Sequence, residues 1–215
     1  MIIALLGQAG AGKDTVADHL AKAHQGVKIA LADPLKRYCQ DAYDFTDDQL
    51  WGPSSSRNRA DERYPREHTF KLKGACNECL CCGYVWKDSL VPPPPSFMSQ
   101  CFLTPRYALQ LLGTEFGRHC YSNTWIQKGV RVAQQLLADP DARYDRRTGV
   151  HRVKSEGAPI KHVIISDVRF RNEMTAIQNA GGKVWRIVPQ ASKEGSETWR
   201  AHQSEAEQLS IPDSE

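Results

Sequence analysis

The chain has 215 residues, 40% of them hydrophobic, and a formal net charge of +3. This length predicts one α/β domain with room for an insertion, and the charge is too small to indicate nucleic-acid binding by itself. No apolar run approaches the roughly 20 residues of a membrane span, and no signal peptide precedes the first expected strand. We therefore expect no membrane partner, a cytoplasmic location, and cysteines that are thiols or metal ligands rather than disulfides.

The N-terminal segment 2–20, IIALLGQAGAGKDTVADHL, predicts a strand, a glycine-rich loop and a helix that begins near Lys13. The loop has the phosphate-binding pattern G-x-x-x-x-G-K, in which backbone N–H groups surround phosphate oxygens and the helix N-terminus adds its dipole. Lys13 is expected to reach the β- and γ-phosphates. The backbone groups expected to contact the phosphates belong to Gly7, Ala9, Gly10, Ala11 and Gly12. The alternative is a glycine-rich turn without a ligand, and the flanking strand and helix favour the phosphate loop.

The residue after the lysine is Asp14, where this pattern usually has serine or threonine. A carboxylate can hold Mg²⁺ directly or through water, because this ion prefers hard oxygen ligands. We expect Asp14 and Thr15 to organise Mg²⁺, with Thr15 also in reach of an α- or β-phosphate.

The next elements in chain order are a buried strand at 27–32, a helix at 34–50 that Asp33 and Pro34 open, and a change of character from 52 to 100. Segment 52–100 is rich in Arg, Pro, Ser and Cys, and we interpret it as an inserted module whose proline run is a stiff strap. Thr104 and Pro105 are typical of a helix start, and that helix is expected to stop at Gly113.

The inserted module contains a cysteine cluster, CNECLCCGYVW. One C-x-x-C pair supplies half of a zinc site, and the second pair could come from Cys81 or Cys82, His68 or Cys101. Dense surface thiols would oxidise, which favours a metal, although the second pair lacks regular spacing. The candidate ligands of a structural Zn²⁺ are Cys76, Cys79, Cys82 and His68.

The last part of the chain predicts a helix at 124–138, a basic lid-like loop at 139–160, strands at 162–166 and 184–188, and a helix at 172–182. Alternating strands and helices predict a doubly wound parallel sheet with helices on both faces, whose ligands sit at the carboxyl ends of the strands. That edge would gather the phosphate loop, Asp33 and Asp167–Arg169. Asp167 is placed to hold a metal or its waters, or alternatively to cap a helix; Arg169 could reach a phosphate or be a surface arginine.

Two groups of arginines remain. Arg106 and Gln110 share a helix face and, with Arg118 nearby, could offer a guanidinium to a phosphate and an amide to a base; the alternative is a solvated polar face. At least one arginine near or within 139–160 is expected to belong to a lid, from the set Arg131, Arg143, Arg146, Arg147 and Arg152.

Five segments in order resemble the bacteriophage-type deoxynucleoside monophosphate kinases: GQAGAGKDTVAD, LADPLK, RYALQLLGTEFGR, IISDVRFRNEM and HQSEAEQL. The resemblance implies a P-loop kinase fold and transfer of the ATP γ-phosphate to a deoxynucleoside 5′-monophosphate, with ATP and Mg²⁺ as cofactors and nucleotides as partners. It implies catalytic roles for Lys13, Asp14, Asp167 and Arg169. It also implies substrate contacts by Asp33, Lys36, Arg106, Gln110, Arg118 and Glu173. The cysteine-bearing insertion lies outside the shared core, and the family continues past HQSE into one more strand and helix.

Two alternatives stay open. One is the same fold acting on another acceptor: a small metabolite, or a hydroxymethylated base in DNA gripped by Arg57, Arg59, Arg63 and Arg66. The other is a non-catalytic nucleic-acid-binding module with a zinc knuckle and a nucleotide sensor, which Lys13 and Asp167 disfavour. The sequence is compatible with a homodimer. For a phage-encoded chain, the cytoplasmic location would be that of the host cell.

Overall fold

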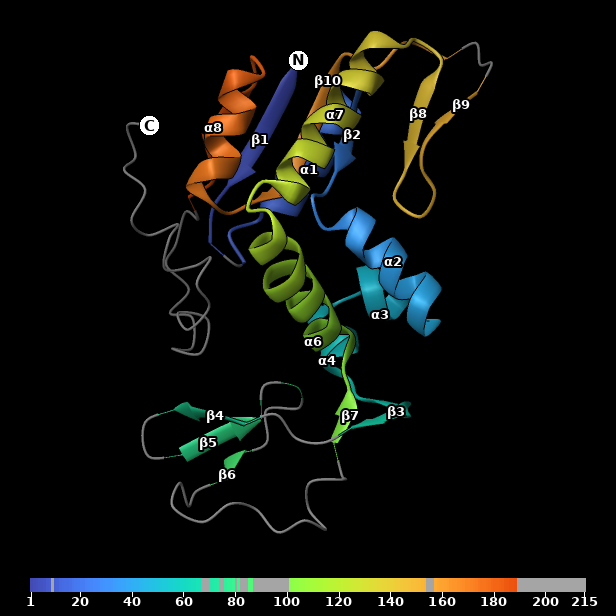
Figure 1. Cartoon of the computed structure of the whole chain (residues 1–215). Helices are drawn as coiled ribbons and strands as arrows, with labels where there is room; N and C mark the ends of the chain where they lie inside the picture. Colours follow the sequence, from blue (N-terminus) through green and yellow to red (C-terminus); the bar gives the residue numbers. More distant parts are fainter. Residues whose placement is uncertain are drawn as a thin grey trace. The chain divides into compact units, whose positions relative to one another are not determined.

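The computed structural model describes residues 1–8, 10–66, 70–73, 76–79, 81, 85–86, 101–153 and 157–188. The chain forms two compact units: one is made of Met1–Pro34 with Gly117–Glu215, the other of Leu35–Phe116. Figure 1 labels their elements, and each unit is described by itself below.

The first unit is built on a four-stranded parallel sheet with the order β11-β1-β10-β2. Its strands are β1 (Ile2–Leu6), β2 (Gly26–Ile29), β10 (His162–Val168) and β11 (Lys183–Arg186). The central pair is in register from Ile2 opposite Val163 to Ala4 opposite Ile165. Parallel neighbours need crossover connections, so the sheet requires the helices that separate these strands in the chain.

Helices cover both faces of this sheet, as the sequence predicts. The side chains of Ile2, Ala4 and Leu6 pack in one core with helices α7 (Thr124–Ala138) and α8 (Arg171–Asn179). Ile3 and Leu5 point the other way and pack against helix α1 (Lys13–Ala23). Successive strand residues face opposite sides, which explains why the whole of β1 is apolar.

The segment 139–160 is not a loop throughout, and that part of the sequence prediction is wrong. Strands β8 (Ala142–Asp145) and β9 (Gly149–Arg152) pair antiparallel as a hairpin. Ala142 is buried, and Tyr144 and Val150 pack against the same core as α7. Arg143 and Asp145 alternate with the core-facing residues of β8, and Arg146 and Arg147 lie in the turn, so the charged composition hid the alternation of a short hairpin. The lid role itself stays a prediction.

The second unit begins within helix α2 (Asp33–Tyr43), which is followed by α3 (Asp47–Trp51), α4 (Ser54–Asn58) and β3 (Asp61–Arg66). The predicted single helix at 34–50 is wrong, because the chain turns at Asp44, whose φ is 47°, and restarts at Thr46. The Thr46 hydroxyl accepts from the Gln49 amide, and the Gln49 side chain accepts from the Thr46 amide. This reciprocal capping box makes a second helix N-terminus.

The rest of this unit contains β4 (Phe70–Lys73), β5 (Cys76–Cys79), β6 (Val85–Trp86), β7 (Cys101–Leu103) and α6 (Pro105–Gln110). Thr104 caps α6 with its hydroxyl on the Tyr107 amide, as predicted. The predicted stop at Gly113 is wrong, because a π-helix, η1 (Leu111–Arg118), continues from α6. A Cβ on Gly113 would lie 3.0 Å from the Leu35 side chain, so this glycine serves close packing rather than termination. The proline run at 92–95 lies outside the described residues.

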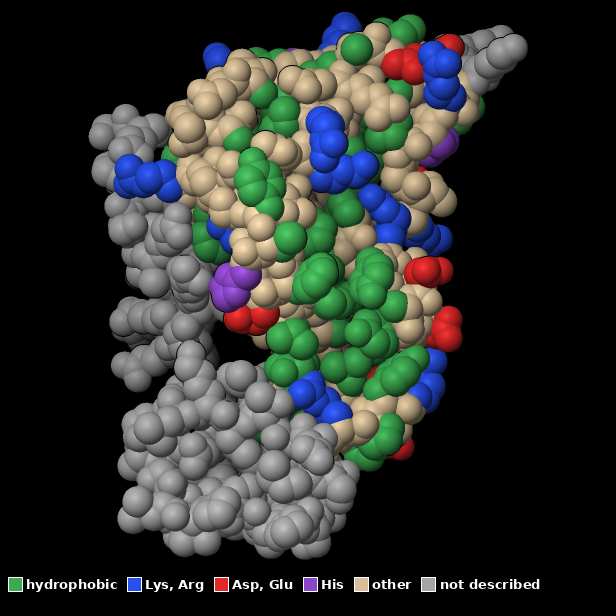
Figure 2. Space-filling view, viewed as in Figure 1, with side chains coloured by type: hydrophobic (Ala, Val, Ile, Leu, Met, Phe, Trp, Pro, Cys, Tyr) green, Lys and Arg blue, Asp and Glu red, His purple; other side chains and the backbone are tan. Residues whose placement is uncertain are grey.

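No helix in the described part of the chain is long and apolar enough to cross a membrane. On the face drawn in Figure 2, the described Lys and Arg side chains stand in small separate groups among other side chains.

Candidate active site

The loop between β1 and α1 has backbone conformations that favour glycine. Gly7, Gly10 and Gly12 all have positive φ, at 155°, 78° and 84°. At Gly7 there is also no room for a side chain, since a Cβ would lie 2.6 Å from the Ile187 carbonyl oxygen. Ala11 donates to Gln8, which closes the turn at 3.1 Å. Ala9, another predicted contact, lies outside the described residues.

Lys13 is the first residue of α1 and lies against this loop. Its ammonium donates to the carbonyl oxygens of Gly7 at 2.5 Å and Gln8 at 2.7 Å. The N-cap is Gly12, which has no side chain to satisfy the first N–H groups of the helix. A helix N-terminus of this kind favours an anion, because its amides and the helix dipole act in the same direction.

Asp14 and Thr15 follow on the exposed side of the first turn of α1. The Asp14 carboxylate lies 3.6 Å from the Lys28 ammonium, which pairs more closely with Asp18 at 2.6 Å. Among the residues that the structure describes, no three His, Cys, Asp or Glu side chains gather as a metal site. A hard carboxylate and a hydroxyl beside the loop fit Mg²⁺ that is held mainly by nucleotide phosphates and water.

Asp167 lies in β10, one residue before the end of that strand. Its Oδ1 accepts from the Leu31 amide at 2.7 Å and its Oδ2 from the Ala32 amide at 3.1 Å. Desolvation by the surrounding protein raises the pKa of Asp167 above its usual value, and the nearby charge of Asp33 adds to the rise. The carboxylate therefore holds the turn that follows β2.

Asp33 is buried and belongs to the same turn. Its Oδ2 accepts from the Ala30 amide at 3.1 Å and from the Tyr144 hydroxyl at 2.8 Å. The predicted gathering of Asp33 and Asp167 at one edge of the sheet is therefore observed in the first unit, and the hairpin reaches the same place. Local sequence gave no signal for the Tyr144 contact, because Tyr144 lies 111 residues from Asp33.

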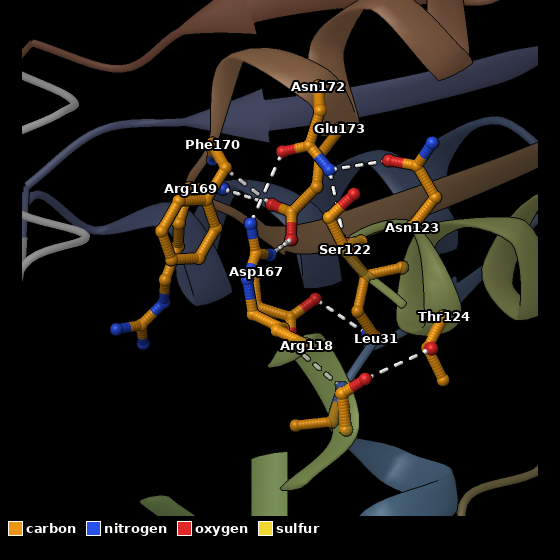
Figure 3. A network of polar contacts seen from close by, with 12 residues as sticks. Leu31, Arg118, Ser122, Asn123, Thr124, Asp167, Arg169, Phe170, Asn172 and Glu173 are labelled. Atoms are coloured by element: carbon orange, nitrogen blue, oxygen red, sulfur yellow. Dashed lines mark hydrogen bonds and ion pairs between the residues drawn. The ribbon is translucent and has the colours of Figure 1, made fainter. Parts of the chain in front are cut away.

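Arg118 and the buried Glu173 form a partly buried ion pair, with Nη1 and Oε1 2.8 Å apart (Figure 3). The other oxygen of Glu173 accepts from the backbone amides of Arg169 at 2.8 Å and Phe170 at 3.1 Å. Burial raises the pKa of Glu173 to about 7, against the lowering effect of these donors and of Arg118. Both carboxylate oxygens of Glu173 thus have protein partners. The substrate contact that the resemblance implies for this residue stays a prediction.

Arg169 contributes its backbone to this network and sends its side chain elsewhere. The side chain is exposed. Figure 3 shows its guanidinium pointing away from the Arg118–Glu173 pair. A role in binding phosphate stays a prediction for this residue.

Three predicted substrate residues belong to the second unit. The Lys36 ammonium lies 5.7 Å from the centre of the Trp51 ring. Arg106 donates to Asn58 Oδ1 and to Ser54 Oγ, the latter at 3.2 Å, so it connects α6 to α4. Gln110 is exposed at the end of α6, where the π-helix begins.

Of the four predicted zinc ligands, Cys79 is the one whose side chain the structure describes. His68 and Cys82 lie outside the described residues, and Cys76 is described by its backbone alone. Cys79 Sγ lies 3.9 Å from Cys101 Sγ, and both residues are buried. Cys81 donates to the Phe102 carbonyl at 3.0 Å. Structural zinc stays a prediction.

The first unit combines a parallel sheet, helices on both faces and a glycine loop with a lysine after β1, which is consistent with a kinase-like α/β fold. A sequence model of the deoxynucleotide monophosphate kinase family matches residues 1–80. A putative deoxynucleotide monophosphate kinase of Acanthamoeba polyphaga mimivirus is 25% identical over 213 residues, which covers 98% of this chain and 83% of the relative. The resemblance to deoxynucleotide monophosphate kinases, first drawn from the motifs, is thereby confirmed.

Proposed function

We propose that this protein transfers the γ-phosphate of ATP to a deoxynucleoside 5′-monophosphate and forms the diphosphate. The observation that carries the proposal is the Lys13 ammonium, seated 2.5 Å from the Gly7 carbonyl in a glycine loop at the carboxyl end of β1. The family match over residues 1–80 includes this loop, and the name of the viral relative supports the acceptor class.

In this proposal, the phosphate loop and Lys13 bind the phosphates of the donor. Mg²⁺, held with Asp14 and Thr15, would supply charge neutralisation for the transferred group. Asp167 fixes the turn after β2 through both of its oxygens, and its role in holding metal-bound water stays a prediction. Catalysis then depends on positioning and charge, since the acceptor phosphate is already ionised and needs no strong base.

The acceptor would be held by guanidinium and amide groups, because a phosphate and a base edge both require fixed donors. Arg118 is the candidate in the first unit, with Arg169 beside its network. The substrate contacts that the resemblance implies for Asp33, Lys36, Arg106 and Gln110 stay predictions.

The hairpin β8–β9 is the proposed lid. Arg146 and Arg147 lie in its turn, whereas Arg152 pairs with Asp139 at 2.7 Å and Arg143 donates to the carbonyls of Pro140 and Ala142. A lid that excludes water would limit hydrolysis of ATP.

DNA as the acceptor is not favoured. Arg63 pairs with the Asp61 carboxylate at 2.7 Å, Arg57 donates to Ser54, and Arg66 stacks on the Tyr107 ring at 4.2 Å. Side chains bound within the fold in this way are poorly placed to form a row along a strand backbone. Homodimer formation and a cytoplasmic location remain predictions.

The test is ADP formation from ATP and Mg²⁺ with dAMP, dGMP, dCMP or dTMP, and with duplex DNA as a further acceptor. We expect turnover with at least one monophosphate, and a loss of about 100-fold or more in Lys13→Ala, because Lys13 stabilises charge on the transferred group. Lys22→Ala, on the exposed last turn of the same helix, is the matched control and should keep full activity. Equal turnover in Lys13→Ala, or turnover with DNA alone, would overturn the proposal.

A further inference from the structure

We propose that Glu173 is a positioning residue that acts through Arg118: it fixes the guanidinium against the Phe170 ring so that Arg118 presents its remaining donors to the phosphate of the acceptor. The identity of this ligand rests on the proposed function. The arrangement of the three side chains is an observation of the structure (Figure 3).

The guanidinium of Arg118 is held on three sides. Nη1 donates to Glu173 Oε1 at 2.8 Å, and Nη2 donates to Asn172 Oδ1 at 3.3 Å. The central carbon lies 3.5 Å from the centre of the Phe170 ring. A stacked guanidinium with two fixed donors has little freedom to rotate, so its plane is set before any ligand arrives.

The groups that hold Arg118 are themselves fixed. Glu173 is tied by Oε2 to the amides of Arg169 and Phe170 at the start of α8. Asn172 donates its Nδ2 to Asn123 Oδ1 at 2.6 Å and to the Ser122 carbonyl at 3.2 Å, which directs its Oδ1 toward Arg118. The network therefore connects the segment before α7 with the first turn of α8.

Two properties favour positioning over a purely structural pair. A buried ion pair contributes little net stability, because removing two charges from water offsets their attraction. Arg118 also keeps 15% of its side chain exposed, while Glu173 keeps 5%, so it is the arginine that a ligand can reach. A guanidinium has five N–H groups, and the two bonds above use two of them, which leaves a fork suited to a phosphate.

The test is a double-mutant cycle with Glu173→Gln, Arg118→Gln and the double variant, measured as steady-state constants for both substrates. We expect Glu173→Gln to raise the KM for the acceptor about tenfold and to change the KM for ATP less than twofold. In the Arg118→Gln background, Glu173→Gln should add nothing, because its effect passes through Arg118. Glu62→Gln, an exposed position in the second unit, is the matched control.

Two outcomes would overturn the proposal. One is an additive cycle, which would mean that Glu173 acts independently of Arg118. The other is a lower melting temperature in Glu173→Gln with both KM values unchanged, which would mark a structural role alone. If Glu173→Gln does not fold, Asn172→Ala removes the 3.3 Å contact to Arg118 together with the Asn172 bonds to Asn123 and the Ser122 carbonyl, and we expect a two- to threefold rise in the acceptor KM.

A second readout does not depend on activity, so a failure of the proposed function can be told apart. The Nε–H resonance of Arg118 is identified in a ¹⁵N spectrum by its loss in Arg118→Gln. Stacking on Phe170 should displace this resonance from the position of free arginine, and Glu173→Gln should return it there. A wild-type resonance already at the free position would overturn the proposal, whereas absent turnover with a displaced resonance would overturn only the proposed function.

Discussion

At the scale of single residues, Asp167 is a predicted site residue whose carboxylate is bound within the fold through both oxygens. Both oxygens accept backbone amides, from Leu31 and Ala32, at the turn that carries Asp33. An acidic residue at this edge was predicted to hold a metal or its waters. The observed bonds mean that a loss of activity on substitution would not by itself demonstrate metal binding.

We therefore predict that Asp167→Asn lowers stability as well as activity. The amide NH₂ would face one of the two backbone N–H groups, donor against donor, and a buried donor left unsatisfied costs about 1–3 kcal/mol. Chemical denaturation of the wild type and Asp167→Asn measures this difference. Asp141→Asn, at an exposed position, is the control. An unchanged free energy of unfolding would show that the two amide bonds do not hold the turn.

The candidate site residues differ in how well the sequence alone predicts their contacts. Lys13 and Gly7 were predictable because their spacing is local and the loop chemistry needs those residue types. Glu173 was assigned to substrate, although its position three residues after Phe170 matches a residue that bonds the amides at a helix start. Phe170 and Asn172 carried no signal, because their contacts to Arg118 join positions more than 50 residues apart.

At the scale of elements, the hairpin β8–β9 is the part whose structure departs most from its sequence interpretation. The Tyr144 hydroxyl of this hairpin donates a hydrogen bond to Asp33. Ala142 and Val150 pack into the apolar core that also contains residues of α7. A lid that closes over a nucleotide would have to move against these contacts.

We predict that Tyr144→Phe loosens the hairpin without disturbing the sheet. The substitution keeps the apolar ring and removes the bond to Asp33, which costs about 0.5–1.5 kcal/mol. Hydrogen exchange should become faster at the amides of 142–152 and stay unchanged at those of β1. Tyr38→Phe, at a position 55% exposed, is the control. Unchanged exchange in the hairpin would show that the apolar contacts alone hold it.

Strands and helix starts could be predicted where a short stretch of sequence carries their apolar pattern or their capping residues. The apolar runs of β1 and β10 identified central strands, and Thr104 with Pro105 identified a helix start. Thr46 and Gln49 form a capping pattern that indicates a new helix start before α3. The surrounding residues of 34–50 are also polar, so this pattern did not stand out from them. Gly113 was misread because a packing requirement against Leu35 is a tertiary property that no local pattern contains.

At the scale of the whole molecule, the two units differ in what supports them. The first unit has a parallel sheet with cores on both faces, and the second has short helices and small antiparallel sheets. The family match over residues 1–80 spans parts of both units. The buried Glu173 lies in the first unit, so its ionisation bears on the stability of the unit whose sheet carries the glycine loop.

We predict that Glu173 makes the folded protein less stable as pH rises from about 4.5 to about 7. Its pKa is 4.5 when exposed and about 7 when buried, so the folded state binds more protons than the unfolded state in this window. The free energy of unfolding falls with pH wherever the folded state binds more protons than the unfolded state. The pKa shift of Glu173 corresponds to about 3 kcal/mol, at about 1.36 kcal/mol per pKa unit. The contribution is complete below pH 4.5 and lost above pH 7.

Melting temperatures of the wild type and Glu173→Gln between pH 5 and pH 8, at constant ionic strength, measure this contribution. The glutamine stays neutral throughout, and all other titrating groups, including His162, are shared by both proteins. The wild type should therefore lose stability relative to Glu173→Gln as pH rises, with the difference constant above pH 7. Parallel curves would mean that Arg118 and the two backbone amides keep Glu173 ionised in the folded state, since those donors oppose the effect of burial.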